Sequence, residues 1–169
     1  MGERLEALET VPFAAEREWE VEGVPVLSAS AQVPEPVDTG RTARRIKRFY
    51  RLQCRSFLRY CEKCRAALEA SRPLPSFQAE LTYQVTWNQG GLWSLYTQVR
   101  EAPGPGPALL TRRGDTWDLA AGYPVPLKDF FPAGTAWKKR LLAQAAAEAE
   151  RRERAGAGRW REDWRRQLR

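Results

Sequence analysis

The sequence contains no histidine among its 169 residues, and this absence removes the most frequent general base of enzymes. Serine nucleophile schemes therefore lack their usual partner, and no glycine-rich loop matches a phosphate cradle. Three cysteines, an odd number, do not suggest a disulfide framework. We therefore expect a protein that is not an enzyme, with no catalytic, cofactor-binding or metal-binding residues and no cofactor.

Two of the cysteines, Cys61 and Cys64, have the C-x-x-C spacing of half a zinc site or of a redox pair. Zinc usually takes four ligands from cysteine, histidine or carboxylate, and the sequence has no second cysteine pair. Cys54 lies two helical turns earlier on nearly the same face. We interpret the three residues as small buried thiols.

Long hydrophobic runs are also absent. No stretch approaches the roughly 18 consecutive apolar residues of a transmembrane helix. The first six residues are acidic and lack the apolar region of a signal peptide. These absences predict a cytoplasmic chain without a transmembrane segment.

Charge is unevenly distributed along a chain whose net charge is +7. Residues 1–22 contain seven glutamates and only two arginines, and we expect them to form a weak helix or a loose arm. The predicted organisation is an acidic N-terminal arm over residues 1–22, a single domain over residues 23–155 and a basic C-terminal tail over residues 156–169.

The strongest helical pattern runs from about residue 41 to residue 70. Apolar residues recur there at three- and four-residue steps, at Ile46, Phe49, Tyr50, Phe57, Leu58, Cys61 and Leu68. The opposite face is basic. That face and the tail suggest a partner surface formed by Arg44, Arg48, Arg51, Arg55, Trp160 and Trp164. A solvated helix face, with a tail that packs elsewhere, is the alternative interpretation.

Strand patterns fill much of the remaining domain. Residues 24–33 predict a first strand, and residues 81–99 predict a hairpin with Leu81, Tyr83, Val85 and Trp87 on one face. Residues 116–119 form a third candidate, and residues 123–127 an edge or a connector because of two prolines. A second helix is expected from about residue 136 to residue 154. The predicted class is α+β, with both helices packed on a mostly antiparallel sheet and Trp117 buried against the long helix.

The segments N-Q-G-G-L-W-S-L-Y and D-T-W-D-L-A-A-G-Y-P-V-P-L-K-D-F-F-P resemble a bacterial domain of unknown function. That domain is best known as the extracytoplasmic sensor of RsiV-type anti-sigma factors, and some peptidoglycan deacetylases also carry it. The resemblance covers roughly residues 24–169 and is greatest to a short stand-alone form. It implies an α+β fold and, by analogy with the anti-sigma factor, which binds lysozyme, a binding role.

Two departures from the family pattern affect this interpretation. A Gly-Ala-His-Gly-like turn is replaced by residues 101–107, which are rich in proline and glycine. The family also continues beyond the position of Arg169, so the chain is expected to lack a C-terminal segment and to have an uncovered sheet edge through which it can self-associate.

The resulting functional prediction is a non-enzymatic domain that binds a protein or another ligand, similar to the RsiV-type sensor. One alternative is a basic nucleic-acid-binding protein, because the helix face and the tail are rich in arginine. Another is an accessory domain of a cell-wall enzyme. Asp115 and Asp118 offer no convergent acid–base pair, because they should project to opposite faces of one strand.

Overall fold

The computed structural model describes residues 7–69, 76–104, 106–157 and 164–167. Its elements are β1 (Thr10–Val21), β2 (Val24–Pro36), α1 (Arg41–Glu69), β3 (Phe77–Gln89), β4 (Leu92–Pro103), β5 (Leu109–Asp118), β6 (Tyr123–Pro124), the 3-10 helix η1 (Leu127–Phe130), α2 (Trp137–Arg154) and α3 (Trp164–Gln167). The chain divides into an N-terminal unit, residues 1–125, and a C-terminal unit, residues 126–169.

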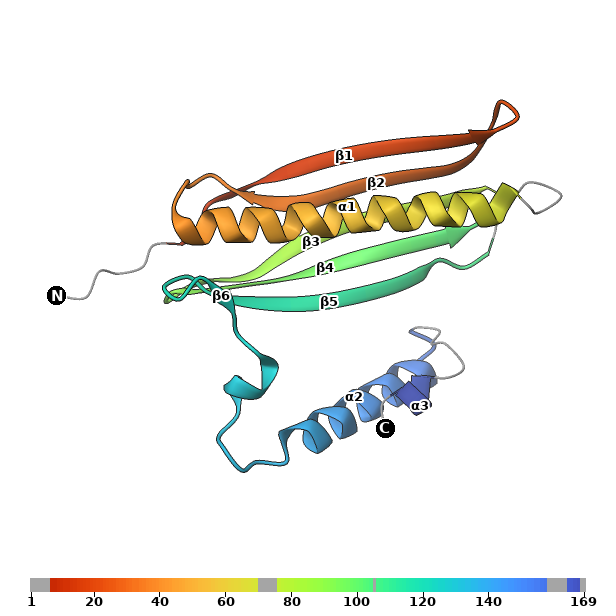
Figure 1. Cartoon of the computed structure of the whole chain (residues 1–169). Helices are drawn as coiled ribbons and strands as arrows, with labels where there is room; N and C mark the ends of the chain where they lie inside the picture. Colours follow the sequence, from red (N-terminus) through yellow and green to blue (C-terminus); the bar gives the residue numbers. More distant parts are fainter. Residues whose placement is uncertain (1–6, 70–75, 105, 158–163, 168–169) are drawn as a thin grey trace. The chain divides into compact units, whose positions relative to one another are not determined.

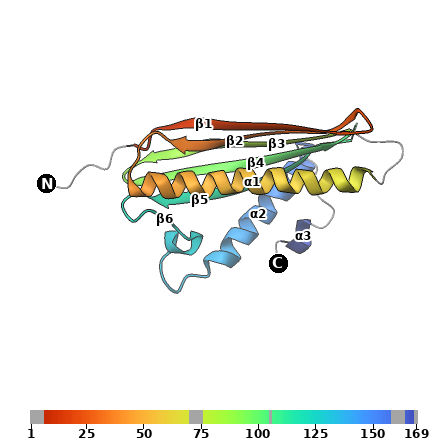
Figure 2. The same ribbon diagram turned by 45° about the horizontal axis from the view of Figure 1, so that its top comes forward.

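The N-terminal unit is a six-stranded sheet with α1 lying along one face (Figures 1 and 2). The strands follow one another in sequence order, and every neighbouring pair is antiparallel except β2 and β3. That parallel pair needs a long crossover, which α1 supplies. The predicted α+β class, the long helix, the mostly antiparallel sheet and the C-terminal helix are confirmed, whereas packing of the C-terminal helix on the sheet stays a prediction.

Residues with positive φ angles form two tight turns of the sheet. Gln89 pairs with Leu92 across Gly90 and Gly91, whose φ angles are 64° and 77°. Val21 pairs with Val24 across Glu22 and Gly23, with φ angles of 55° and 76°. Two-residue turns with positive φ match the twist of the flanking strands. The predicted hairpin over residues 81–99 is thus confirmed.

The predicted weak helix or loose arm over residues 1–22 was wrong for residues 10–21, which form the edge strand β1. Phe13 pairs with Val33 and Trp19 pairs with Leu27, and both aromatic rings pack against the core. Glutamates alternate with these apolar residues. They masked a period-two pattern that also includes Ala15 and ends at a Glu-Gly turn.

Proline is frequent in β2, yet the strand lies inside the sheet. The ladder between β2 and β3 covers only Leu27 to Ala31, opposite Phe77 to Leu81. Pro25, Pro34 and Pro36 fall outside this ladder, where β2 pairs with β1 alone. Because proline has no N–H to donate, it is tolerated where one side of a strand is unpaired.

A β-bulge redirects the end of β3. Val85 pairs with Leu95, but Trp87 pairs with Ser94, so one residue of β3 has no direct partner. The extra residue moves Trp87 to the opposite face of the sheet from Val85. The predicted placement of Trp87 on the buried face was therefore wrong, and its side chain is 49% exposed.

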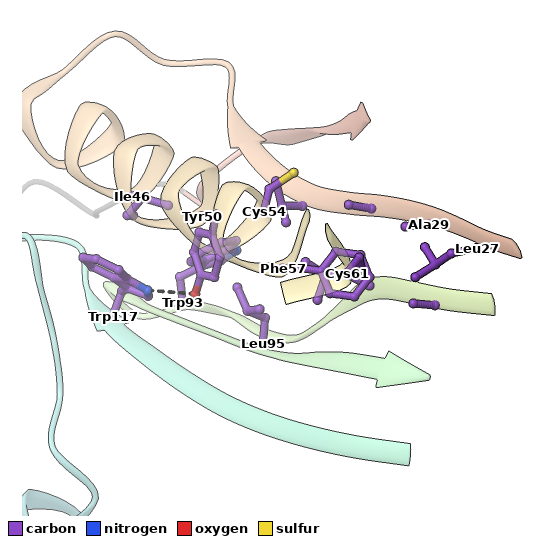
Figure 3. Close-up of a cluster of buried hydrophobic side chains, with 14 of the residues drawn as sticks. Leu27, Ala29, Ile46, Tyr50, Cys54, Phe57, Cys61, Trp93, Leu95 and Trp117 are labelled. Carbon is purple, nitrogen blue, oxygen red and sulfur yellow. Dashed lines mark hydrogen bonds between the residues drawn. The ribbon is translucent and has the colours of Figure 1, made fainter. Parts of the chain in front are cut away.

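The core lies between α1 and the sheet (Figure 3). The buried residues of α1 are Ala43, Ile46, Tyr50, Cys54, Phe57 and Cys61. Trp117 is 3% exposed, and its ring meets Phe49 edge-on at 5.4 Å between ring centroids. The predicted packing of Trp117 against the long helix is confirmed.

The C-terminal unit contains α2, close to its predicted bounds, and the short helix α3. Trp137, the first residue of α2, stacks on Phe131 with ring centroids 5.5 Å apart. Arg165 of α3 donates a hydrogen bond of 3.0 Å to Glu153 of α2, so the two helices contact each other.

Candidate functional site: the outer face of α1

The outer face of α1 carries a row of arginines. Arg44, Arg48 and Arg55 are exposed, and Arg41 and Arg59 continue the same face at three- and four-residue steps. We call these five residues the arginine row. They lie opposite the side chains that pack on the sheet, such as Ile46, Tyr50 and Cys54. At 1.5 Å per residue the row is roughly 27 Å long.

No carboxylate in the described part of the chain forms an ion pair with any member of the arginine row. Several other arginines of the unit are held by neighbours. Arg45, for example, lies over the ring of Tyr123 at 4.2 Å and donates a hydrogen bond of 3.4 Å to the backbone oxygen of Gly122. The unpaired guanidinium groups of the row are therefore free to bind an external anion.

Arg51, which the sequence grouped with this surface, lies on the flank of α1 that faces β1 and β2. It forms a salt bridge with Glu35, and its guanidinium group lies over the Phe13 ring at 3.1 Å. Lys47 contacts Glu35 at 2.7 Å. The hydrogen bond from Lys47, followed by that from Arg51, lowers the pKa of the Glu35 carboxyl. Arg51 therefore holds α1 against the hairpin formed by β1 and β2.

Leu52 interrupts the arginine row between Arg48 and Arg55. Leu52 is 49% exposed, although it is an apolar residue of α1, the helix with the strongest amphipathic pattern in the sequence. Sequence reasoning did not single it out, because one exposed leucine on a helix is ordinary. An apolar side chain surrounded by arginines has the composition of a protein contact, where arginine is enriched around a less polar centre.

The two tryptophans of the predicted surface are not brought to this face by any described contact. Trp160 lies outside the described residues. Trp164 is 8% exposed and lies beneath the guanidinium group of Arg165, at 4.4 Å from the ring centroid. An indole that is 8% exposed offers little surface to a protein partner.

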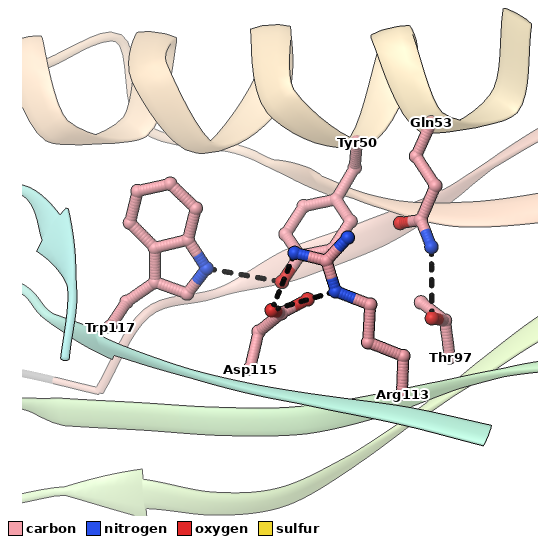
Figure 4. A network of polar contacts seen from close by, with 6 residues as sticks. All are labelled: Tyr50, Gln53, Thr97, Arg113, Asp115 and Trp117. Carbon is pink, nitrogen blue, oxygen red and sulfur yellow. Dashed lines mark hydrogen bonds and ion pairs between the residues drawn. The ribbon is translucent and has the colours of Figure 1, made fainter. Parts of the chain in front are cut away.

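A polar network lies between α1 and the strands β4 and β5 (Figure 4). The indole nitrogen Nε1 of Trp117 donates a hydrogen bond of 3.0 Å to the Tyr50 hydroxyl, and burial raises the pKa of that hydroxyl. Arg113 contacts Asp115 at 3.2 Å, and Gln53 donates to Thr97 at 2.9 Å. The contacts of Trp117 with Tyr50 and of Gln53 with Thr97 join the helix to the sheet, whereas Arg113 and Asp115 both belong to β5.

The two candidate carboxylates have structural surroundings. Asp115 lies on the core face beside Arg113, and its side chain is 8% exposed. Asp118 accepts hydrogen bonds of 2.9 Å from the backbone nitrogens of Ala120 and Ala121, which fixes the turn after β5. They project to opposite faces, as the strand pattern predicted.

The cysteines are free thiols, with Cys54 and Cys61 buried and Cys64 half-buried. Burial raises the pKa of the Cys61 thiol to about 12, which disfavours the nucleophilic thiolate. Within the described ranges, no group of three or more cysteine, aspartate and glutamate residues is placed to hold a metal ion.

The outer edge of β5 presents unpaired backbone groups. The nitrogen of Val125 donates to the oxygen of Thr116 at 2.7 Å, so the backbone of Thr116 faces this edge. By strand alternation Gly114, Arg112 and Leu110 face it too, and no described residue pairs with them there. Whether the chain associates through this edge stays a prediction.

These features define an α+β domain with a basic helix face. Among the described helices, none is long and apolar enough to cross a membrane.

Comparison with solved structures identifies the type of fold. A member of the DUF3298 family from Bacteroides fragilis matches with a TM-score of 0.60 at 14% identity, over 88% of this chain and 71% of that chain. A DUF3298 family protein from Pseudomonas aeruginosa matches with a TM-score of 0.55 at 16% identity, over 86% of this chain and 69% of that chain. The chain therefore has a DUF3298-type fold. No model of a known protein family and no curated protein matches the sequence.

Proposed function

We propose that the chain is a non-enzymatic binding domain that receives an acidic protein on the outer face of α1. The observation that carries this proposal is the arginine row, whose five guanidinium groups lack ion-pair partners among the described residues. Guanidinium groups bind carboxylates in a planar, two-pronged geometry. An acidic surface would therefore find several such sites along one straight element.

Leu52 favours a protein over a nucleic acid as the partner. An exposed leucine forms no hydrogen bond or ion pair with a phosphate backbone. Protein contacts, in contrast, commonly have an apolar centre with a charged rim. Nucleic acid is the second candidate, because a row of arginines also releases counterions from DNA or RNA.

We further propose that the chain contains an RsiV-like domain. The fold of two DUF3298 family proteins and the resemblance of the D-T-W-D-L segment support this assignment. In the chain that segment supplies Trp117 to the core and Asp118 to the following turn. A binding role is what the resemblance implies, and the arginine row gives it a location.

The test uses a fluorescent helical peptide of about 20 residues, long enough to follow the row, with glutamates on one face and a central leucine. Its affinity for the full chain is measured by anisotropy in about 150 mM salt and compared with that of a short DNA duplex. Arg44→Gln/Arg48→Gln/Arg55→Gln should weaken peptide binding about tenfold, since each exposed pair contributes about 0.5 kcal/mol.

The matched control, Arg17→Gln/Arg100→Gln/Arg112→Gln, removes three exposed charges from the sheet and should leave affinity within about twofold. Leu52→Ala should weaken binding of the peptide but not of the duplex. Equal losses in the two triple variants would mean that only net charge matters. If the duplex binds more tightly than the peptide, and Leu52→Ala leaves the affinity for the duplex unchanged, the result would favour the nucleic-acid function.

A further inference from the structure

A second surface, independent of the proposed function, lies within the C-terminal unit. A hollow of about 700 Å³ opens between α2 and α3. Trp137 and Trp164 stand along its walls, and Leu142, Ala143 and Ala146 lie between them. The alanine methyl groups are too short to fill the space beside two indoles. The volume falls within the range of small-molecule sites.

The walls of this hollow are fixed by local contacts. The ring of Trp137 is stacked on Phe131, at an interplanar angle of 14°. Arg165 holds α3 on α2 through Glu153 at 3.0 Å and Glu150 at 3.8 Å. The hollow therefore belongs to one helical hairpin, with each wall held by a partner outside the space.

The rim of the hollow is positively charged. Lys138 and Lys139 line it, both are exposed, and no carboxylate of the described residues pairs with either ammonium group. Thr135 adds a hydroxyl, whose proton is donated to the backbone oxygen of Pro132 at 2.8 Å. An apolar floor with two unpaired cations at its mouth is complementary to a molecule with an apolar chain and an anionic head.

We propose that this hollow binds a single-chain amphiphile with a carboxylate head, of the free fatty acid type. The chain lies against Leu142, Ala146 and the two indoles, and the carboxylate meets Lys138 and Lys139. Burying the chain provides most of the affinity, and the lysines fix which end of the molecule faces water.

The experiment titrates the full chain with dodecanoate by calorimetry, below the concentration at which micelles form. One molecule should bind per chain, and each methylene removed from the probe should weaken binding by about fourfold. Lys138→Gln/Lys139→Gln should weaken dodecanoate about fivefold and leave dodecanol unchanged. Ala146→Trp fills the hollow and should abolish binding, whereas Ala147→Trp, on an exposed neighbouring position, should retain it.

Several outcomes would overturn the proposal. These are the absence of saturable binding, binding of dodecanol as tightly as dodecanoate, equal losses in the two tryptophan variants, and uptake only in the presence of lipid vesicles. The lysine variant keeps the test decisive if Ala146→Trp disturbs α2, because both lysines are solvent-exposed and circular dichroism reports the helix content of each variant.

Discussion

At the scale of single residues, Trp117 joins β5 to α1 both by ring packing and by a hydrogen bond. Its ring meets Phe49 edge-on, and its indole nitrogen donates to the buried hydroxyl of Tyr50. Tyr50 in turn meets Trp93 at 5.9 Å between ring centroids. These aromatic contacts connect one helix face with two adjacent strands.

We expect Trp117→Ala to lower the free energy of unfolding by about 3–5 kcal/mol, because it removes a large buried ring and leaves a cavity. Urea unfolding measures the change. Trp87→Ala is the matched control and should cost less than about 1 kcal/mol, since that indole is half exposed. Similar losses in the two variants would contradict the assignment of Trp117 to the core.

Tyr50→Phe isolates the polar part of this contact. The substitution leaves the indole N–H of Trp117 buried without its acceptor and should cost about 1–3 kcal/mol. In Trp117→Phe, which has no N–H, the additional change Tyr50→Phe should cost much less. A double-mutant cycle measured by urea unfolding gives the coupling, and a coupling near zero would exclude the hydrogen bond as a source of stability.

Glu35 gives a pH dependence with a defined sign. Lys47 and Arg51 hold its pKa below the ordinary value of 4.5, so its contribution is present above that value and is lost as the pH falls through the lower, folded-state pKa. Glu35→Gln should therefore destabilise the protein near neutral pH by up to about 1 kcal/mol. The difference from wild type should shrink in acid. If the unfolding midpoints of wild type and Glu35→Gln differed by the same amount at neutral and acidic pH, the predicted dependence of stability on the ionisation of Glu35 would be contradicted.

At the scale of elements, the turn between β3 and β4 depends on backbone conformation. Gly90 has a φ of 64° and open space around the position of a Cβ atom, so a substitution there tests strain without a clash. Gly90→Ala should destabilise the protein by about 1 kcal/mol, and Gly90→Asn by less, because asparagine tolerates positive φ. Thermal unfolding measures both, and equal midpoints for the two variants would refute the argument.

The sequence was sufficient to predict α1, α2 and the hairpin of β3 and β4, because their periodicity and turn residues are local properties. It was insufficient for β1, where glutamates between Phe13 and Trp19 imitate a solvated arm. The bulge that turns Trp87 outward depends on pairing with Ser94, which no single-strand pattern contains. In the same way, the sequence could not show that Arg51 is paired whereas Arg48 is not, because that difference depends on Glu35 lying beside one flank of α1.

At the scale of the whole molecule, every residue of the main core lies in the N-terminal unit. A chain ending at Val125 should therefore fold cooperatively, with a free energy of unfolding within about 1 kcal/mol of the full chain. Urea unfolding followed by tryptophan fluorescence measures this, with Trp117→Ala in the shortened chain as the destabilised reference. A non-cooperative or unfolded fragment would contradict the division into two units.

The parallel contact between β2 and β3 sets an order of assembly during synthesis. Leu27 and Phe77 meet although fifty positions separate them, whereas both antiparallel hairpins close over two-residue turns. Long-range pairing of this kind is slow, because loop closure precedes any gain from contacts. A nascent chain will thus leave the ribosome with β2 able to cover only part of the apolar side of α1, and the part around Tyr50 stays exposed until Trp93 and Trp117 arrive.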